Sequence, residues 1–106
     1  MTNQALNVID CATLTVSNTA IGLASATPAL LKGLVSGKTV RRAVISCNTD
    51  DVRWRADGAV PTSTVGHLLE ADGSVSFTGA NYKSLLNQIL FIRVTTDATL
   101  FITYFD

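Results

Sequence analysis

The sequence predicts an all-β protein, a single small antiparallel β-sandwich or barrel of the jelly-roll or immunoglobulin-like kind. Short runs rich in β-branched and aromatic residues recur at intervals typical of such folds, and we expect about seven or eight short strands. Two pairs, Asp57-Gly58 and Asp72-Gly73, predict tight turns, because glycine adopts positive φ without steric cost. Apolar and polar residues alternate along the N-terminal run, as in a half-buried strand. At most one or two short helical turns are expected.

Composition limits the organisation and the partners. At 106 residues the chain is expected to form one domain, residues 1–106, with a single modest core. Hydrophobic residues make up 47% and charged residues 15%, which indicates a folded chain. The formal net charge of +0 argues against a partner recognised through phosphate neutralisation, so neither nucleic acid nor a membrane surface is expected. No apolar run approaches the roughly 20 residues of a membrane-spanning helix, and no secretory signal is evident.

The N-terminal part contains two clear strands and one open region. Residues 6–16 alternate with period two. Asp10 interrupts the apolar face, which indicates either a bulge or a point where the strand changes partner. Residues 17–37 allow either a helical turn around 29–34 or a short strand at 20–24 followed by a loop. Residues 39–47 are rich in β-branched side chains and predict a strand.

Residues 51–79 predict a meander of three short strands, at 52–55, 65–70 and 74–78, joined through the two Asp-Gly turns. Pro61 confines residues 59–64 to an edge or a loop, because proline cannot donate to a sheet. Residues 82–86 would form a helical turn or a crossover. The last two strands are predicted at 88–95 and 99–105.

Arg53, Trp54 and Arg55 are the most informative residues for binding. In a strand, Val52 and Trp54 would share one face and the two arginines the other. Arginine and tryptophan are enriched at binding hot spots, so a subunit contact is one hypothesis. The alternative is that Trp54 belongs to the core and the arginines pair with Asp51 or Asp57. The predicted subunit or capsid interface comprises Arg53, Trp54, Arg55, Asp57, Pro61 and His67.

Catalytic chemistry is not indicated. His67 is the only histidine, and no nucleophile-elbow motif accompanies it. Asp57 and Glu70 are a carboxylate pair that glycoside hydrolysis would require, but nothing in the sequence sets their separation. We therefore expect no enzymatic activity, no catalytic residues and no cofactor.

Metal binding is not indicated either. Asp50, Asp51 and Asp57 do not follow the spacing of a calcium loop and are interpreted as turn caps. Cys11 and Cys47 lack a CxxC spacing and are interpreted as two small buried hydrophobic residues, rather than a disulfide or metal ligands.

A family resemblance involves residues 42–104. It is carried by Val52-Arg53-Trp54-Arg55, Asp57-Gly58, Pro61-Thr62, Gly66 and Leu68, then Ile89-Leu90-Phe91-Ile92 and Leu100-Phe101-Ile102-Thr103-Tyr104. This pattern resembles small β-sandwich virion proteins of tailed bacteriophages.

The resemblance implies a structural virion component, and among these roles a capsid decoration, or cement, protein. Its implied partners are the major capsid protein and further copies of itself as a homotrimer. Its implied location is the capsid surface, after assembly in the host cytoplasm. Contacts between copies would bury apolar residues such as part of 30–35, Phe101 or Phe105. A head-to-tail connector, a tail component and a carbohydrate-binding β-sandwich using Trp54 as a stacking platform remain alternatives.

Overall fold

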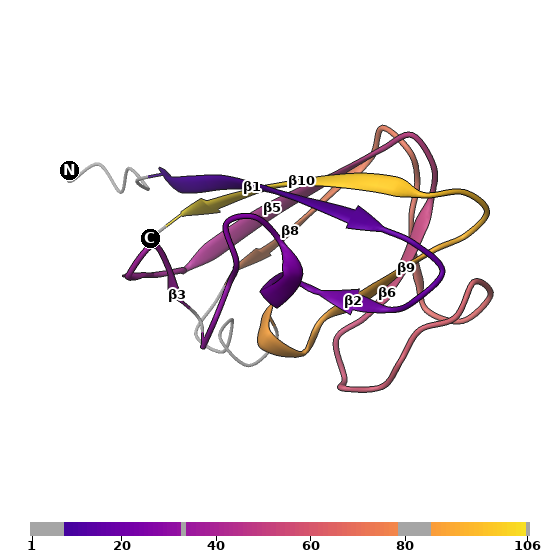
Figure 1. The fold of residues 1–106 in the computed structure, drawn as a ribbon, viewed down its shortest axis with the longest axis horizontal. Helices are drawn as coiled ribbons and strands as arrows, with labels where there is room; N and C mark the ends of the chain where they lie inside the picture. The colour runs from indigo at the N-terminus through magenta and orange to yellow at the C-terminus, as the bar shows by residue number, and fades with distance from the viewer. Residues whose placement is uncertain (1–7, 33, 79–85, 106) are drawn as a thin grey trace.

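The computed structural model describes residues 8–32, 34–78 and 86–105. Its described elements include ten strands and one 3-10 turn (Figure 1). These are β1 (Val8–Val16), β2 (Ile21–Gly22), η1 (Leu23–Ser25), β3 (Leu34–Val35), β4 (Lys38–Thr39), β5 (Arg42–Asn48), β6 (Val52–Arg55), β7 (His67–Leu69), β8 (Ser74–Thr78), β9 (Leu90–Arg93) and β10 (Ala98–Phe105). The predicted all-β fold is confirmed.

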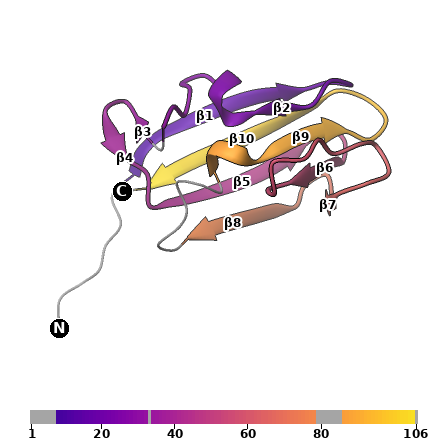
Figure 2. The ribbon, with the colours of Figure 1, turned by 90° about the horizontal axis from the view of Figure 1, so that it is seen from below.

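Eight of these strands form two four-stranded antiparallel sheets. One has the order β1-β10-β5-β8 and the other the order β2-β9-β6-β7 (Figure 2). Along the chain, the connections β1–β2, β5–β6, β7–β8, β8–β9 and β9–β10 all cross from one sheet to the other. Two Greek keys wound together in this order make a jelly roll, so strand order selects the jelly roll among the expected sandwich types.

The core lies between the two sheets. Buried side chains alternate along β1, β5 and β10, as the period-two pattern predicts. The largest fully buried side chains are Tyr104, Phe91, Leu23, Leu30, Ile45, Leu86, Ile89, Leu100 and Ile102. Strands from both sheets contribute to this set, so the two sheets share one core.

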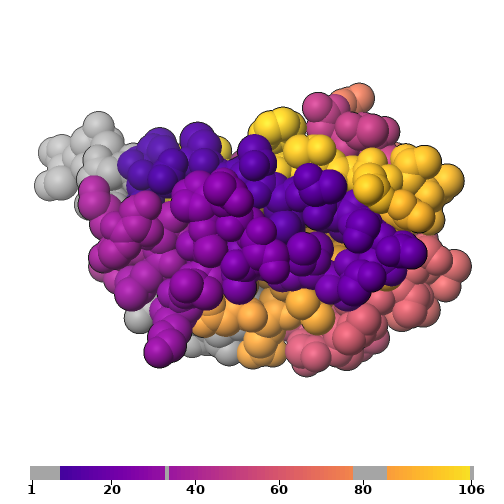
Figure 3. All heavy atoms as spheres, viewed as in Figure 1, coloured from indigo at the N-terminus to yellow at the C-terminus, as the bar shows by residue number. Residues whose placement is uncertain are grey.

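The segment between β1 and β5 closes one edge of the sandwich. Figure 3 shows it, in indigo to magenta, spread over the side where β1 and β2 lie. The amide of Thr13 in β1 donates to the carbonyl of Thr27, and the amide of Thr27 donates back to Thr13. Leu23, Leu30 and Val35 of this segment are buried. They therefore seal this edge of the core.

The outer face of the β1-β10-β5-β8 sheet has an unusual composition. Its cross-strand rows combine hydroxyl side chains with a few apolar ones. These are Cys11, Thr13 and Thr15 of β1; Thr99, Phe101 and Thr103 of β10; Val44 and Ser46 of β5; and Ser74 and Ser76 of β8. We call this surface the hydroxyl face.

The structure decides the open region of the N-terminal part. A short strand, β2, followed by a loop is found, and the alternative helical turn around residues 29–34 is wrong: Leu31 instead bridges Leu34. The hairpin β3–β4 was not predicted. Its two-residue turn, Ser36-Gly37, has φ values of 52° and 78°, the conformation that suits a tight hairpin. The bulge at Asp10 is confirmed by a register shift between Val8 and Asp10.

The predicted meander over residues 51–79 is only half right. β6 and β7 form an antiparallel hairpin, but β8 leaves their sheet and pairs with β5. The second turn therefore moves the chain between sheets. At Asp57-Gly58 the glycine takes the positive φ, whereas at Asp72-Gly73 it is Asp72, with φ 67°. Gly73 is required for space, because a Cβ there would lie 2.9 Å from the Glu70 carbonyl oxygen.

Of the predicted turn at 82–86, residues 82–85 lie outside the described residues, and residues 86–88 are helical. Residues 59–64 form a loop, as Pro61 predicts. No helix in the described ranges is long and apolar enough to cross a membrane.

Candidate functional site

Three rings from successive strands gather at the edge of the sandwich formed by β7 and β8. The indole of Trp54 in β6 lies with its centroid 4.5 Å from the imidazole of His67 in β7, with the planes tilted by 32°. The Phe77 ring of β8 meets the same indole edge-on at 5.2 Å. Trp54 and Phe77 are half-buried and pack against the core. Aromatic residues therefore cover the edge opposite the one sealed by the segment between β1 and β5.

The loop that follows β6 contains Pro61 and is hydrogen-bonded to Arg53 of that strand. The Nε of Arg53 donates to the Ser63 carbonyl at 3.1 Å, and its Nη1 donates to the Gly66 carbonyl at 3.0 Å. Pro61 is buried. Both residues were predicted at an interface. The hydrogen bonds of Arg53 hold the loop against β6, whereas Pro61 is buried within it. Contact of either residue with a partner stays a prediction.

Arg55 and Asp57 form a two-pronged ion pair at the rim of the same region. The Nε of Arg55 donates to Asp57 Oδ1 at 3.1 Å and its Nη2 donates to Oδ2 at 2.5 Å. Asp57 Oδ1 also accepts the Ala59 amide at 3.2 Å. The hydrogen bonds from Arg55, and then from Ala59, lower the pKa of Asp57 below its usual value. Asp57 is thus held ionised and oriented, and the predicted pairing of an arginine with Asp57 is confirmed.

These residues enclose an open groove of about 540 Å³. Its lining consists of Trp54, Arg55, Ala56, Asp57, Val65, Gly66 and His67. Four of the six predicted interface residues line it together, namely Trp54, Arg55, Asp57 and His67. Indole and imidazole surface forms one part of this groove and the Arg55–Asp57 pair another, so it offers apolar contact beside fixed charges.

One apolar side chain of the groove lining is exposed, since Val65 has an exposed fraction of 50%. Val60 in the same loop is 61% exposed. Leu68 is 46% exposed, but it pairs with Arg53 across the hairpin and therefore faces the other side of the sheet from Trp54 and His67. We call the groove, including the exposed Val65, the Trp54 corner. Ala56, Val65 and Gly66 also line the groove but were not among the predicted interface residues, although each is a sequence neighbour of one of them.

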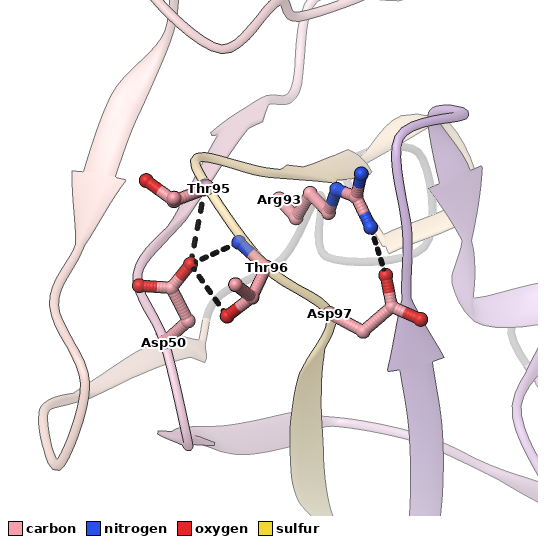
Figure 4. Close-up of polar contacts among 5 residues, drawn as sticks. All are labelled: Asp50, Arg93, Thr95, Thr96 and Asp97. Carbon is pink, nitrogen blue, oxygen red and sulfur yellow. Dashed lines mark hydrogen bonds and ion pairs between the residues drawn. The ribbon is translucent and has the colours of Figure 1, made fainter.

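Asp50 and Asp51 act as turn caps, as predicted, at one end of the sandwich. Asp50 Oδ2 accepts the amides of Thr95 at 3.1 Å and Thr96 at 2.6 Å, and the Thr96 hydroxyl at 3.2 Å (Figure 4). These bonds, with the Thr96 amide foremost, lower the pKa of Asp50. Asp51 Oδ1 accepts the Ala71 amide at 2.8 Å. The turn after β5 is thereby tied to the β9–β10 turn and to the β7–β8 turn.

The cysteines differ in environment. Both are free, so no disulfide joins them. Cys47 is buried as predicted, and its thiol donates to the Asp50 carbonyl at 2.9 Å. Cys11 is exposed, so its predicted burial is wrong, because the register of β1 places it on the outer face beside Thr103. Among the residues the structure describes, no group of three or more His, Cys, Asp or Glu side chains could hold a metal ion.

Asp57, Glu70 and His67 are the side chains considered above for catalysis, and the structure brings two of the three together. Asp57 and His67 line the same groove, whereas Glu70 is not part of its lining.

Comparison of the chain with protein-family models, with curated proteins and with solved structures gave no match.

Proposed function

We propose that this chain is a non-enzymatic structural protein of a bacteriophage virion, a decoration protein that binds the major capsid lattice through the Trp54 corner. The resemblance over residues 42–104 supports the class of protein. The jelly roll is consistent with it, since many viral capsid proteins use this architecture, although lectins and cupins do as well. The observation that carries the proposal is the composition and exposure of the Trp54 corner.

The Trp54 corner has the features of a protein-binding surface. The exposed Val65 and the rings of Trp54 and His67 supply its apolar area. The Arg55–Asp57 pair lines the same groove and supplies oriented donors and acceptors. Hot spots in interfaces combine aromatic and arginine anchors with a surrounding ring that excludes water. The bonds from Arg53 to the loop hold this surface in one shape before binding, which reduces the ordering cost.

Such a protein would act by mass action. It would bind the assembled lattice and not the separate capsid subunit, and would thereby stabilise the lattice. A capsid presents many equivalent sites, so oligomeric copies gain avidity even where each contact is weak. The capsid surface is the corresponding location, and the major capsid protein is the corresponding partner.

Co-sedimentation with capsids of the virus that encodes the chain tests this function. The unaltered protein is expected to pellet with expanded capsids, and Val65→Asp, in the lining of the groove, to weaken its binding at least tenfold. Leu31→Asp, at a residue 60% exposed on another part of the molecule, is the matched control and should bind normally. Absence of binding, or equal binding by all variants, would contradict the proposal. Binding confined to the portal vertex or tail would instead assign the protein to a connector or tail role.

A second candidate is carbohydrate binding at the same groove. The observation that favours it is that the Trp54 indole is half-buried rather than fully buried and lines an open groove beside a fixed Arg–Asp pair. Ligand sites typically combine apolar aromatic surface with a few placed polar groups. Titration with a panel of hexose and amino-sugar oligosaccharides should then change Trp54 emission saturably. Unchanged emission and no heat of binding across the panel would exclude this candidate.

A further inference from the structure

The hydroxyl face lacks charge. Among outward positions of β1, β10, β5 and β8 in the described residues, Arg42 carries the only formal charge, and it lies at one end, with its guanidinium 5.4 Å from the Phe105 ring centroid. A surface with about 25–35% charged residues of both signs is the composition recommended to keep a small designed domain soluble and unassociated. The centre of this four-stranded face carries no charge, so it presents no electrostatic barrier to another neutral surface.

Phe101 occupies the middle of this face. β10 lies between β1 and β5, and the partners of Phe101 across the sheet are Thr13 and Ser46. Its side chain is 46% exposed. Aromatic side chains are enriched at the centre of interfaces, and the small side chains around Phe101 leave its ring accessible to a partner.

We propose that a second copy of this chain packs on the hydroxyl face, with a twofold axis near Phe101. Close to such an axis each residue meets its own counterpart, so charged residues there would repel one another. The absence of both positive and negative charge from the centre of the face is what self-pairing requires. A different protein could complement charges of either sign and would not require it.

The size of the face indicates the strength of the contact. Four strands spaced about 4.8 Å apart, along a strand of about eight residues at 3.4 Å each, cover roughly 500 Å² per copy. Two copies would bury about 1,000 Å², which is near the lower limit for a specific interface. We therefore expect a dimer that dissociates on dilution, and that gains stability when other contacts raise its local concentration.

This contact is separate from the proposed capsid contact, because the Trp54 corner belongs mainly to the other sheet. It also departs from the homotrimer implied by the resemblance, since a flat face that packs on itself produces a pair. Capsid binding by an unaltered protein that stays monomeric at every concentration would refute this inference alone. Absence of capsid binding by a protein that still dimerises would refute only the proposed function.

Sedimentation equilibrium from micromolar to millimolar protein tests the pairing. The unaltered protein is expected to approach twice the mass of the monomer at the highest concentrations. Phe101→Glu places two like charges near the axis and should leave the protein monomeric throughout. Leu31→Glu adds the same charge at an exposed residue elsewhere and should behave like the unaltered protein.

A second measurement needs no substitution. Cys11 lies on the hydroxyl face and is exposed, whereas Cys47 is buried. The rate at which a maleimide labels Cys11 should therefore fall as the protein concentration rises into the range where dimers form, and this holds even if Phe101→Glu fails to fold. The proposal would be overturned if the unaltered protein were a monomer at every concentration or formed a trimer. It would also be overturned if Phe101→Glu still dimerised, or if Leu31→Glu dissociated the dimer. Labelling of Cys11 at a rate independent of protein concentration would overturn it as well.

Discussion

The indole of Trp54 lies against the imidazole of His67, with ring centroids 4.5 Å apart. The β6–β7 hairpin makes these two residues cross-strand partners. The only tryptophan and the only histidine of the chain thus form one surface at the edge of the sandwich, and both line the groove of the Trp54 corner.

Replacing His67 by alanine should uncover one side of this indole. Loss of an aromatic pair is expected to lower the free energy of unfolding by about 0.5–1.5 kcal/mol, and the newly hydrated indole should emit at longer wavelength. Urea unfolding followed by tryptophan fluorescence measures both effects. Leu68→Ala, at the exposed neighbouring position, is the control and should leave the emission maximum in place. An unchanged maximum in His67→Ala would contradict the stacking.

Gly66→Ala should disrupt the loop that shapes the groove. Gly66 has φ +133°, and a Cβ there would lie 3.0 Å from the Trp54 carbonyl oxygen and 3.4 Å from the Arg53 Cβ. Backbone strain and this close approach together should cost roughly 2–4 kcal/mol of stability. Gly37 also has positive φ, at +78°, but a Cβ there meets nothing within 4 Å. Gly37→Ala should therefore cost only about 1 kcal/mol. Equal losses for the two variants in chemical denaturation would show that the space around Gly66 is unimportant.

Asp50→Ala should loosen the end of the sandwich where the β9–β10 turn is held. Three donors from Thr95 and Thr96 lose their acceptor, so the midpoint of thermal unfolding is expected to fall by roughly several degrees. Asp97→Ala breaks only the exposed ion pair with Arg93 drawn in Figure 4, and should have little effect. Calorimetry that found the two variants equally stable would contradict this assignment.

The same carboxylate contributes a pH dependence. The pKa of Asp50 is lowered in the folded chain, so its stabilisation is present above the ordinary pKa of 3.8 and is lost as pH falls through the lower, folded-state pKa. The stability of the unaltered protein should therefore decline more steeply in acid than that of Asp50→Ala.

Cys47 should produce the opposite dependence in alkali. Burial, followed by the negative charges of Asp51 and Asp50, raises the pKa of its thiol from 9.0 to about 11. Above pH 9 the thiol ionises in the unfolded chain before it does in the folded one. Stability is thus complete below pH 9 and falls toward pH 11, by up to roughly 2–3 kcal/mol.

Urea unfolding between pH 7.5 and 10.5 should show this loss, and Cys47→Ala should reduce it. Cys11→Ala, which removes an exposed thiol, is the control and should retain the steep decline. If Cys47→Ala lost stability with pH as steeply as the unaltered protein, the dependence would have to come from another group.

Local features of the fold could be predicted from the sequence because they depend on neighbouring residues. The alternation in β1 and the bulge at Asp10, and the opposite faces of Trp54 and Arg53, follow from the period of a strand. The caps formed by Asp50 and Asp51 follow from short carboxylates placed at turns. Four residues of the groove were predicted as one surface because they surround a hairpin.

What the sequence by itself determined about this protein is the identity of its strands and turns, because these depend on residues close in the chain. Only the tertiary structure decided that β8 joins β5 rather than β7, and that Thr13, Phe101, Ser46 and Ser74 form one row. The sheet that a strand joins depends on which pairing buries the apolar faces of all strands together. That choice involves contacts between residues far apart in the chain, which no local pattern contains.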